Sequence, residues 1–226
     1  MIPIRDNRSS LAAPIVTWTI IGLNILIFLW DRHFNLFGQS ATFADLVMKP
    51  QDVVMAVKGQ EPKFALVTVL TSMFLHGSLV HIVGNMLFLM VFGPGIEAAL
   101  GAPRYALYYL FWGVVAAAAH IFVYPHSEVP VLGASGAIGG VLGAYFLLFP
   151  GNKIEIFLPL LAFLTFELPA WILLGLWFVY QLVFPQQGVA NWAHIGGFLA
   201  GMLTVLVMGG RAAVLRGREH EFEYDF

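Results

Sequence analysis

The strongest constraint on this chain is a series of apolar runs that are long enough, or nearly long enough, to cross a lipid bilayer as helices. A hydrocarbon core of about 30 Å requires roughly 17 to 25 helical residues. The runs lie near residues 14–30, 79–99, 104–124, 134–149, 168–184 and 192–208. A mean hydropathy of +0.82 agrees with them. The sequence therefore predicts a membrane protein.

Lipid cannot satisfy the backbone of an open sheet, and these runs lack the alternation of a transmembrane barrel. The predicted fold is an all-α polytopic membrane protein, a compact bundle of six transmembrane helices that forms one domain over residues 1–226. The region from Ile154 to Phe184 is too long for one span and too short for two. We expect its first part, to Phe166, to lie at the membrane interface.

The positive charges orient this bundle, because Lys and Arg in short loops favour the cytoplasmic side. Arg5 and Arg8 place the N-terminus, 1–13, inside, and six spans return the tail, 210–226, to the same side. The long segment 31–78 becomes an outer loop, where the charge rule is weaker. No organelle transit peptide is recognisable, which favours the plasma (inner) membrane.

Composition excludes several classes of function. The chain has no cysteine, so disulfides, a thiolate nucleophile and cysteine-based metal sites are excluded. A net charge of -2 offers no basic field for nucleic acid. We expect no cofactor, no metal and no nucleic acid; the expected partners are the lipid bilayer and other membrane proteins.

Unusual polar residues stand at the starts of the second, fourth and sixth runs, all at the outer side in this topology. His81 and Asn85 share one helix face at the first of these, while Ser135 and His194 open the other two. Polar groups inside spans are costly and usually mark function. The sequence predicts that these four side chains meet.

Glycines recur every three or four residues below two of these polar residues, which leaves two helix faces without bulk. The positions are Gly139 and Gly143 below Ser135, and Gly197 and Gly201 below His194. Such faces allow helices to approach to backbone contact. Docking the two faces brings Ser135 against His194.

A Ser–His pair is sufficient for acyl transfer, because the imidazole accepts the hydroxyl proton and returns it to the leaving amine. Backbone N–H groups at the helix start, with Asn85 and His81, can stabilise an oxyanion. Each residue alone has a simpler explanation: Ser135 as a helix cap, glycines as packing, and His or Asn as bundle hydrogen bonds. Their convergence favours catalysis.

Four segments, in this order, resemble motifs of the rhomboid family of intramembrane serine proteases. They are His76-x4-His81-x3-Asn85, Gly93-x3-Glu97-x3-Gly101, Gly133-Ala-Ser135-Gly136, and Ala193-His194-x2-Gly197-x3-Gly201. The resemblance implies a six-helix membrane domain that cleaves transmembrane segments of other proteins near their extracytoplasmic ends. It implies a Ser135–His194 dyad, an oxyanion site of His81, Asn85 and the Ser135 amide, and a structural role for Glu97.

The chain departs from the family pattern at two places. Val67 and Thr68 stand where many members carry Trp-Arg, so we expect the outer loop to sit differently. Gly139 stands where some members place a Tyr against the catalytic His, which leaves open whether another aromatic holds His194. We interpret His120 as a hydrogen-bonding residue of the bundle, and Gln181 as a substrate or membrane-interface residue.

Three alternatives stay open. The first is a rhomboid-like protein that binds membrane clients without cutting them, although this chain keeps both Ser135 and His194. The second is a transporter with His81, His194 and Glu97 on a polar path. In the predicted topology Glu97 lies at the cytoplasmic end, opposite the two histidines, which disfavours such a path. The third is a metal hydrolase built on His76, His81 and His194, which lacks a carboxylate at that depth.

Overall fold

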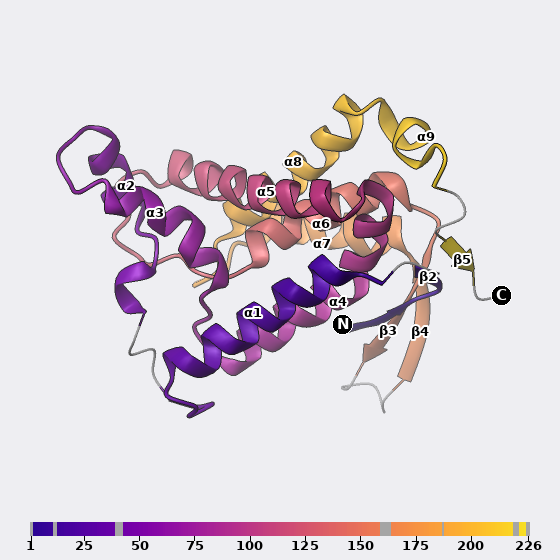
Figure 1. Ribbon diagram of the computed structural model, residues 1–226, viewed down its shortest axis with the longest axis horizontal. Coiled ribbons are helices and arrows are strands. Elements are labelled where there is room, and N and C mark those ends of the chain that lie inside the picture. The colour runs from indigo at the N-terminus through magenta and orange to yellow at the C-terminus, as the bar shows by residue number, and fades with distance from the viewer. Residues whose placement is uncertain are drawn as a thin grey trace.

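The computed structural model of the chain describes residues 2–10, 13–38, 43–158, 164–186, 188–218 and 222–224. Its main body is a bundle of long helices, with short helices at one end and two small β-sheets at the other (Figure 1).

The long helices lie on the six predicted apolar runs. They are α1 (Ile15–Asp31), α4 (Leu79–Leu100), α5 (Ala102–Val123), α6 (Ser135–Leu148), α7 (Ala170–Val183) and α8 (Asn191–Val207). Helices α4 and α5 contain 22 residues each and have the length and hydropathy to cross a bilayer, whereas the others are shorter. The predicted helix positions are confirmed, while the number of spans stays a prediction.

The predicted outer loop 31–78 contains helices of its own. These are η1 (Ala44–Leu46), α2 (Pro50–Val57), α3 (Phe64–Thr71) and η2 (Ser72–Phe74). Pro50 begins α2, where its missing N–H and fixed φ favour a helix start. Helices α2 and α3 pack on each other and on α5 at one end of the molecule (Figure 1).

The all-α prediction is wrong at the other end of the bundle. An antiparallel sheet has the order β1-β3-β4, and a second sheet pairs β2 with β5. The strands are β1 (Ile2–Asp6), β2 (Arg8–Ser10), β3 (Lys153–Leu158), β4 (Leu164–Pro169) and β5 (Phe222–Tyr224). In β3, Ile154 and Ile156 are buried while Lys153 is exposed, which is the period of a half-buried strand. The described parts of the predicted interfacial segment are therefore strands.

The N-terminal strand is fastened to the central helix. The carboxylate of Asp6 accepts hydrogen bonds from the Tyr145 hydroxyl of α6 and from Asn152 Nδ2, the latter at 3.2 Å. Pairing of β2 with β5 brings the N-terminal and C-terminal segments together, so the predicted tail 210–226 is partly folded, as α9 (Gly210–Leu215) and β5. Both ends of the described chain lie at the sheet end (Figure 1).

Helix α6 lies at the centre of the bundle, in contact with α4, α5, α7 and α8. Every residue from Gly136 to Tyr145 is buried. A helix surrounded by other helices on all sides needs small residues wherever a neighbouring backbone comes close.

The predicted glycine faces of α6 and α8 lie against each other at backbone distance. A Cβ atom on Gly143 would lie 1.9 Å from the Phe198 carbonyl oxygen, and one on Gly197 would lie 2.0 Å from that of Gly136. A Cβ atom on Gly201 would lie 1.9 Å from the Gly140 carbonyl oxygen. A side chain does not fit at any of these three glycines without moving a backbone.

Glu97, near the end of α4, is bound by the first turn of α1. Its Oε1 accepts the Val16 N–H at 2.8 Å, and its Oε2 accepts the Thr17 N–H and hydroxyl, each at 2.8 Å. These N–H groups have no partner within their own helix, and a carboxylate also favours the positive end of the helix dipole. Glu97 therefore joins α4 to α1 at the end of α4 opposite His81.

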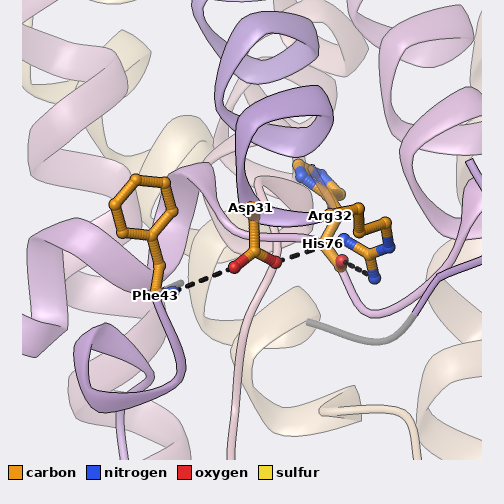
Figure 2. A network of polar contacts seen from close by, with 4 residues as sticks. All are labelled: Asp31, Arg32, Phe43 and His76. Atoms are coloured by element: carbon orange, nitrogen blue, oxygen red, sulfur yellow. Dashed lines mark hydrogen bonds and ion pairs between the residues drawn. The ribbon is translucent and has the colours of Figure 1, made fainter. Parts of the chain in front are cut away.

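The first residues of the outer segment form a buried polar network (Figure 2). Arg32 Nη2 donates to the His76 carbonyl at 2.8 Å, and Arg32 Nη1 lies 3.3 Å from Asp31 Oδ2. Asp31 Oδ1 accepts the Phe43 N–H at 2.9 Å. The two charged side chains are 2% and 3% exposed, so the network joins the end of α1 to the residues just before α4 in a site shielded from water.

Arg32 supplies a buried cation in this segment, whereas Thr68, one of the two residues that depart from the family pattern, donates its hydroxyl to Ala65 in its own helix at 2.6 Å. The loop is thus fastened from the end of α1, and its different placement from that in other family members stays a prediction.

We expect Arg32→Met to lower the free energy of unfolding by about 3 kcal/mol, because it removes the cation that lies 3.3 Å from the buried Asp31 carboxylate. Denaturant unfolding in mild detergent micelles measures this. The double variant Asp31→Asn/Arg32→Met should recover part of the loss. Lys58→Met, which removes an exposed cation of the same segment, is the control and should change stability by less than about 0.5 kcal/mol. Equal stability of Arg32→Met and wild type would contradict this account.

Candidate active site

The four predicted polar residues come from three helices and meet at one place. Ser135 is the first residue of α6, His194 lies in the first turn of α8, and His81 and Asn85 lie in the first turns of α4. Ser135 Oγ lies 2.8 Å from His194 Nε2. At this distance the serine hydroxyl can donate its proton to the imidazole.

The contact between α6 and α8 determines this distance. A Cβ atom on Gly139, one turn below Ser135, would lie 2.8 Å from the backbone carbonyl oxygen of His194. A larger residue there would push α8 away from α6. Gly139 therefore allows the backbones of α6 and α8 to lie in contact at this level.

The His194 ring is held instead from α7. Trp177 lies against it, with ring centroids 5.8 Å apart and planes tilted by 33°. Gln181, one turn further along α7, places Oε1 2.9 Å from His194 Nδ1. The same oxygen accepts Asn191 Nδ2 at 2.8 Å.

Sequence reasoning missed Gln181 as a partner of His194, because we interpreted it as a substrate or interface residue. The available signal was an amide inside an apolar run at helical spacing from Trp177. Asn191, one turn before His194, also received no role. Which helix face of α7 meets α8 could not be read from the sequence, so the pairing was not foreseen.

Gly133 lies opposite His81 and Asn85 and has a φ of +123°, which favours glycine. A Cβ atom there would lie 2.8 Å from His81 Nε2 and 3.5 Å from Asn85 Nδ2. Among the described residues, Asn85 Nδ2 is buried and has no hydrogen-bond partner. A buried amide donor without an acceptor marks a place for the oxygen of a ligand or of water.

His76 packs edge-on against His81, with ring centroids 5.1 Å apart. Burial, reinforced by the neighbouring His81, lowers the pKa of His76 to about 3, so this ring is neutral at pH 7. His76 thus supports His81 without adding a charge beside it.

A cavity of about 700 Å³ is lined by all four residues. Its other walls come from the end of α5, the loop after it, and the loop before α8. His120 of α5, which we interpreted as a hydrogen-bonding residue of the bundle, also lines this cavity, and among the described residues its buried Nδ1 has no hydrogen-bond partner. The polar lining can hold water next to Ser135, as a hydrolytic reaction requires.

The fold and the site define a class: a helical membrane protein in which a serine and a histidine meet in a cavity within the bundle. Comparison with known proteins narrows the class. The rhomboid domain family matches residues 63–211, which include Ser135, His194, His81 and Asn85. This chain belongs to the rhomboid family, as its motifs predicted.

Three relatives illustrate the similarity. Rhomboid protein 1, mitochondrial, of Saccharomyces cerevisiae is 28% identical over 229 residues, covering 84% of this chain and 63% of its own length. RHOMBOID-like protein 4 of Arabidopsis thaliana is 35% identical over 187 residues, covering 78% of this chain and 41% of its own length. Rhomboid protease GluP of Bacillus subtilis is 30% identical over 140 residues, covering 62% of this chain and 25% of its own length. The chain thus spans less than two thirds of each relative's length.

Proposed function

We propose that this protein is an intramembrane serine endopeptidase that cleaves transmembrane segments of other membrane proteins with a dyad of Ser135 and His194. The observation that carries the proposal is the 2.8 Å contact between Ser135 Oγ and His194 Nε2 in a cavity within an apolar bundle. Relatives named rhomboid protease and rhomboid-type serine protease, from Bacillus subtilis and Emericella nidulans, support it.

In the first half of the reaction, His194 Nε2 accepts the hydroxyl proton while Ser135 Oγ bonds to the carbonyl carbon of the scissile peptide. The resulting oxyanion collapses, the C–N bond breaks, and His194 gives its proton to the leaving amine. In the second half, water attacks the acyl-enzyme ester while His194 accepts its proton. Ser135 is released with its proton restored, and the other product is a carboxylic acid.

The oxyanion of each step lies, in this proposal, beside the orphan Nδ2 of Asn85, with His81 and the Ser135 N–H as further donors. The first N–H groups of α6 have no acceptor four residues earlier in the helix, so they are available at the start of the helix. Donors aimed at the developing charge stabilise the transition state more than the ground state.

Asn85→Ala is expected to lower kcat by roughly 10²-fold with little change in KM, because it removes one such donor. Steady-state cleavage of a labelled substrate in micelles measures both constants. Asn24→Ala is the matched control: Asn24 is also buried in an apolar helix, but its Nδ2 donates within α1, to Ile20, at 2.8 Å. If both variants lose activity equally, Asn85 acts through stability and has no oxyanion role.

We also propose that both termini are cytoplasmic and that the cavity opens toward the extracytoplasmic side of a plasma or inner membrane. Pairing of β2 with β5 supports termini on one side, which requires an even number of crossings between them. The cavity is formed where α4, α6 and α8 begin, and the other ends of α4 and α6 lie toward the sheets. Relatives from Saccharomyces cerevisiae and Arabidopsis thaliana are named mitochondrial, so the compartment varies within the family.

The other classes of function have less support. A proton path through Glu97 is disfavoured because both carboxylate oxygens accept hydrogen bonds from α1, at the end of α4 opposite His81. A client-binding protein without activity needs neither the Ser135–His194 contact nor the orphan donor of Asn85. The cavity residues thus favour hydrolysis over these alternatives.

The test is cleavage in liposomes that hold the purified protein and a labelled protein with one conformationally labile transmembrane segment. We expect the wild type to release a product whose mass locates the cut in that segment, near its extracytoplasmic end, and Ser135→Ala to release none. A product that both proteins form would contradict the proposal. Stable binding of the substrate by the wild type without any product would favour the client-binding alternative.

A further inference from the structure

A line of hydrogen bonds leads from the loop before α8 to the far side of the His194 ring. The Gln186 backbone N–H donates to Asn191 Oδ1 at 3.2 Å, Asn191 Nδ2 donates to Gln181 Oε1 at 2.8 Å, and that oxygen lies 2.9 Å from His194 Nδ1. Gln181 and Asn191 are 7% and 6% exposed, so water does not compete for these bonds.

The direction of every bond in this line follows from its first member. A backbone N–H can only donate, so the Asn191 atom that faces Gln186 is the oxygen, and its NH₂ group faces Gln181. Gln181 must then present its oxygen at this point, and an amide oxygen can only accept. His194 Nδ1 therefore carries a proton, which leaves the lone pair of Nε2 directed at Ser135 Oγ.

We propose that Gln181, oriented by Asn191 and the Gln186 N–H, is a positioning residue that selects the Nδ1–H tautomer of His194. The inference rests on the proposed function, because this tautomer is the one in which Nε2 can accept the Ser135 proton. The Nδ1–H bond to Gln181 also persists when Nε2 becomes protonated, so the imidazolium keeps an acceptor during the reaction.

Helix α7 makes two contacts with the ring, because Trp177 and Gln181 lie one helical turn apart. Trp177 packs against the ring with its plane tilted by 33°, while Gln181 Oε1 lies 2.9 Å from Nδ1. Together they restrict both the tilt and the rotation of the His194 ring. A carboxylate is therefore not needed to orient the histidine, as it does in a Ser–His–Asp triad.

Two near-isosteric variants separate the effect of hydrogen-bond direction from the effects of charge and packing. Gln181→Glu presents a carboxylate oxygen that accepts from both Asn191 and His194, so it keeps the direction of the line. Asn191→Asp, at a pH near 8 where a carboxylate is ionised, faces Gln181 with an acceptor. Gln181 then turns its NH₂ group inward and donates to Nδ1, which forces the proton onto Nε2. Each variant adds one negative charge within the same short chain of hydrogen bonds.

The direct readout is the ¹⁵N NMR spectrum of protein labelled at histidine, with the His194 signals assigned by their loss in His194→Gln. We expect the Nδ1–H tautomer in the wild type and in Gln181→Glu, and the Nε2–H tautomer in Asn191→Asp. Cleavage is measured in parallel: Asn191→Asp should lower kcat on the order of 10²-fold with KM little changed, whereas Gln181→Glu stays within about tenfold of wild type.

The proposal is overturned if wild-type His194 is the Nε2–H tautomer, or if the folded Asn191→Asp variant keeps the wild-type tautomer. Thermal unfolding in the same detergent identifies a folded variant, and Asn191→Ser, which lacks the reach to Gln181, replaces Asn191→Asp if the latter does not fold. A mixture of tautomers is then expected, and a pure wild-type tautomer overturns the proposal. If tautomers follow the prediction but the wild type cleaves nothing, the proposed function fails while the positioning role of Gln181 stands.

Discussion

Replacing Ser135 by alanine is expected to lower kcat for a transmembrane substrate by at least about 10⁴-fold, because the proposed nucleophile is removed. His194→Ala should cause a loss of the same order, since the hydroxyl 2.8 Å away then has no base. The double variant should be no worse than either single one, as is expected of residues that act as a unit. Product formation in micelles over a range of substrate concentrations measures these effects.

Ser127→Ala is the control for this series, because Ser127 lines the same cavity but its hydroxyl accepts the Val129 N–H, at 3.2 Å, and has no further hydrogen-bond partner among the described residues. We expect its kcat to stay near that of the wild type. If Ser135→Ala retained a tenth or more of wild-type activity, another group would be the nucleophile, and the dyad would have to be abandoned.

The second large effect concerns stability. Gly143→Val should lower the free energy of unfolding by about 4 kcal/mol or more, or prevent folding, because the new Cβ would lie 1.9 Å from the Phe198 carbonyl oxygen. Neither backbone can give way without separating α6 from α8. Denaturant unfolding in micelles, together with the yield of folded protein, measures the loss.

Gly22→Val is the matched control, since a Cβ atom on Gly22 of α1 meets nothing within 4 Å. Its cost should be below about 1 kcal/mol. Equal stability of the two variants would show that α6 and α8 do not approach as closely as described here, and would remove the basis for the Ser135–His194 distance.

Much of the helical bundle could be predicted because each long helix coincides with an apolar run, and hydropathy is a local property of the sequence. The proximity of α6 and α8 was also accessible, since the spacing of Gly139 and Gly143 matches that of Gly197 and Gly201 on the partner helix. Two helix faces that carry glycines at the same spacing have few ways to pack against each other.

The hairpin of β3 and β4 is local, but we interpreted the first part of this region as an interfacial segment. The other two strand pairings could not be foreseen because they are not local. Strand β1 pairs with β3, and β2 with β5, across most of the length of the chain, and neither β1 nor β5 is long enough to show an alternating pattern by itself. The helices of the outer segment were missed because the apolar residues of α2 and α3 are fewer than a span requires.

Within the site, the sequence indicated residue types but not their neighbours. Which side of α7 faces α8 depends on packing between two apolar helices. The contacts of Trp177 and Gln181 with His194 are therefore products of tertiary structure, and so is the place of His120 in the cavity wall.

The central claim, that His194 activates Ser135, is tested most directly by a fluorophosphonate reagent, which phosphonylates an activated serine with loss of fluoride. Mass spectrometry of the digested protein locates the adduct. The account predicts an adduct on Ser135 in the wild type, and labelling that is slower by at least about 10²-fold in His194→Ala, where Ser135 is still present. Labelling of His194→Ala at the wild-type rate, or of another serine with Ser135 unmodified, would contradict it.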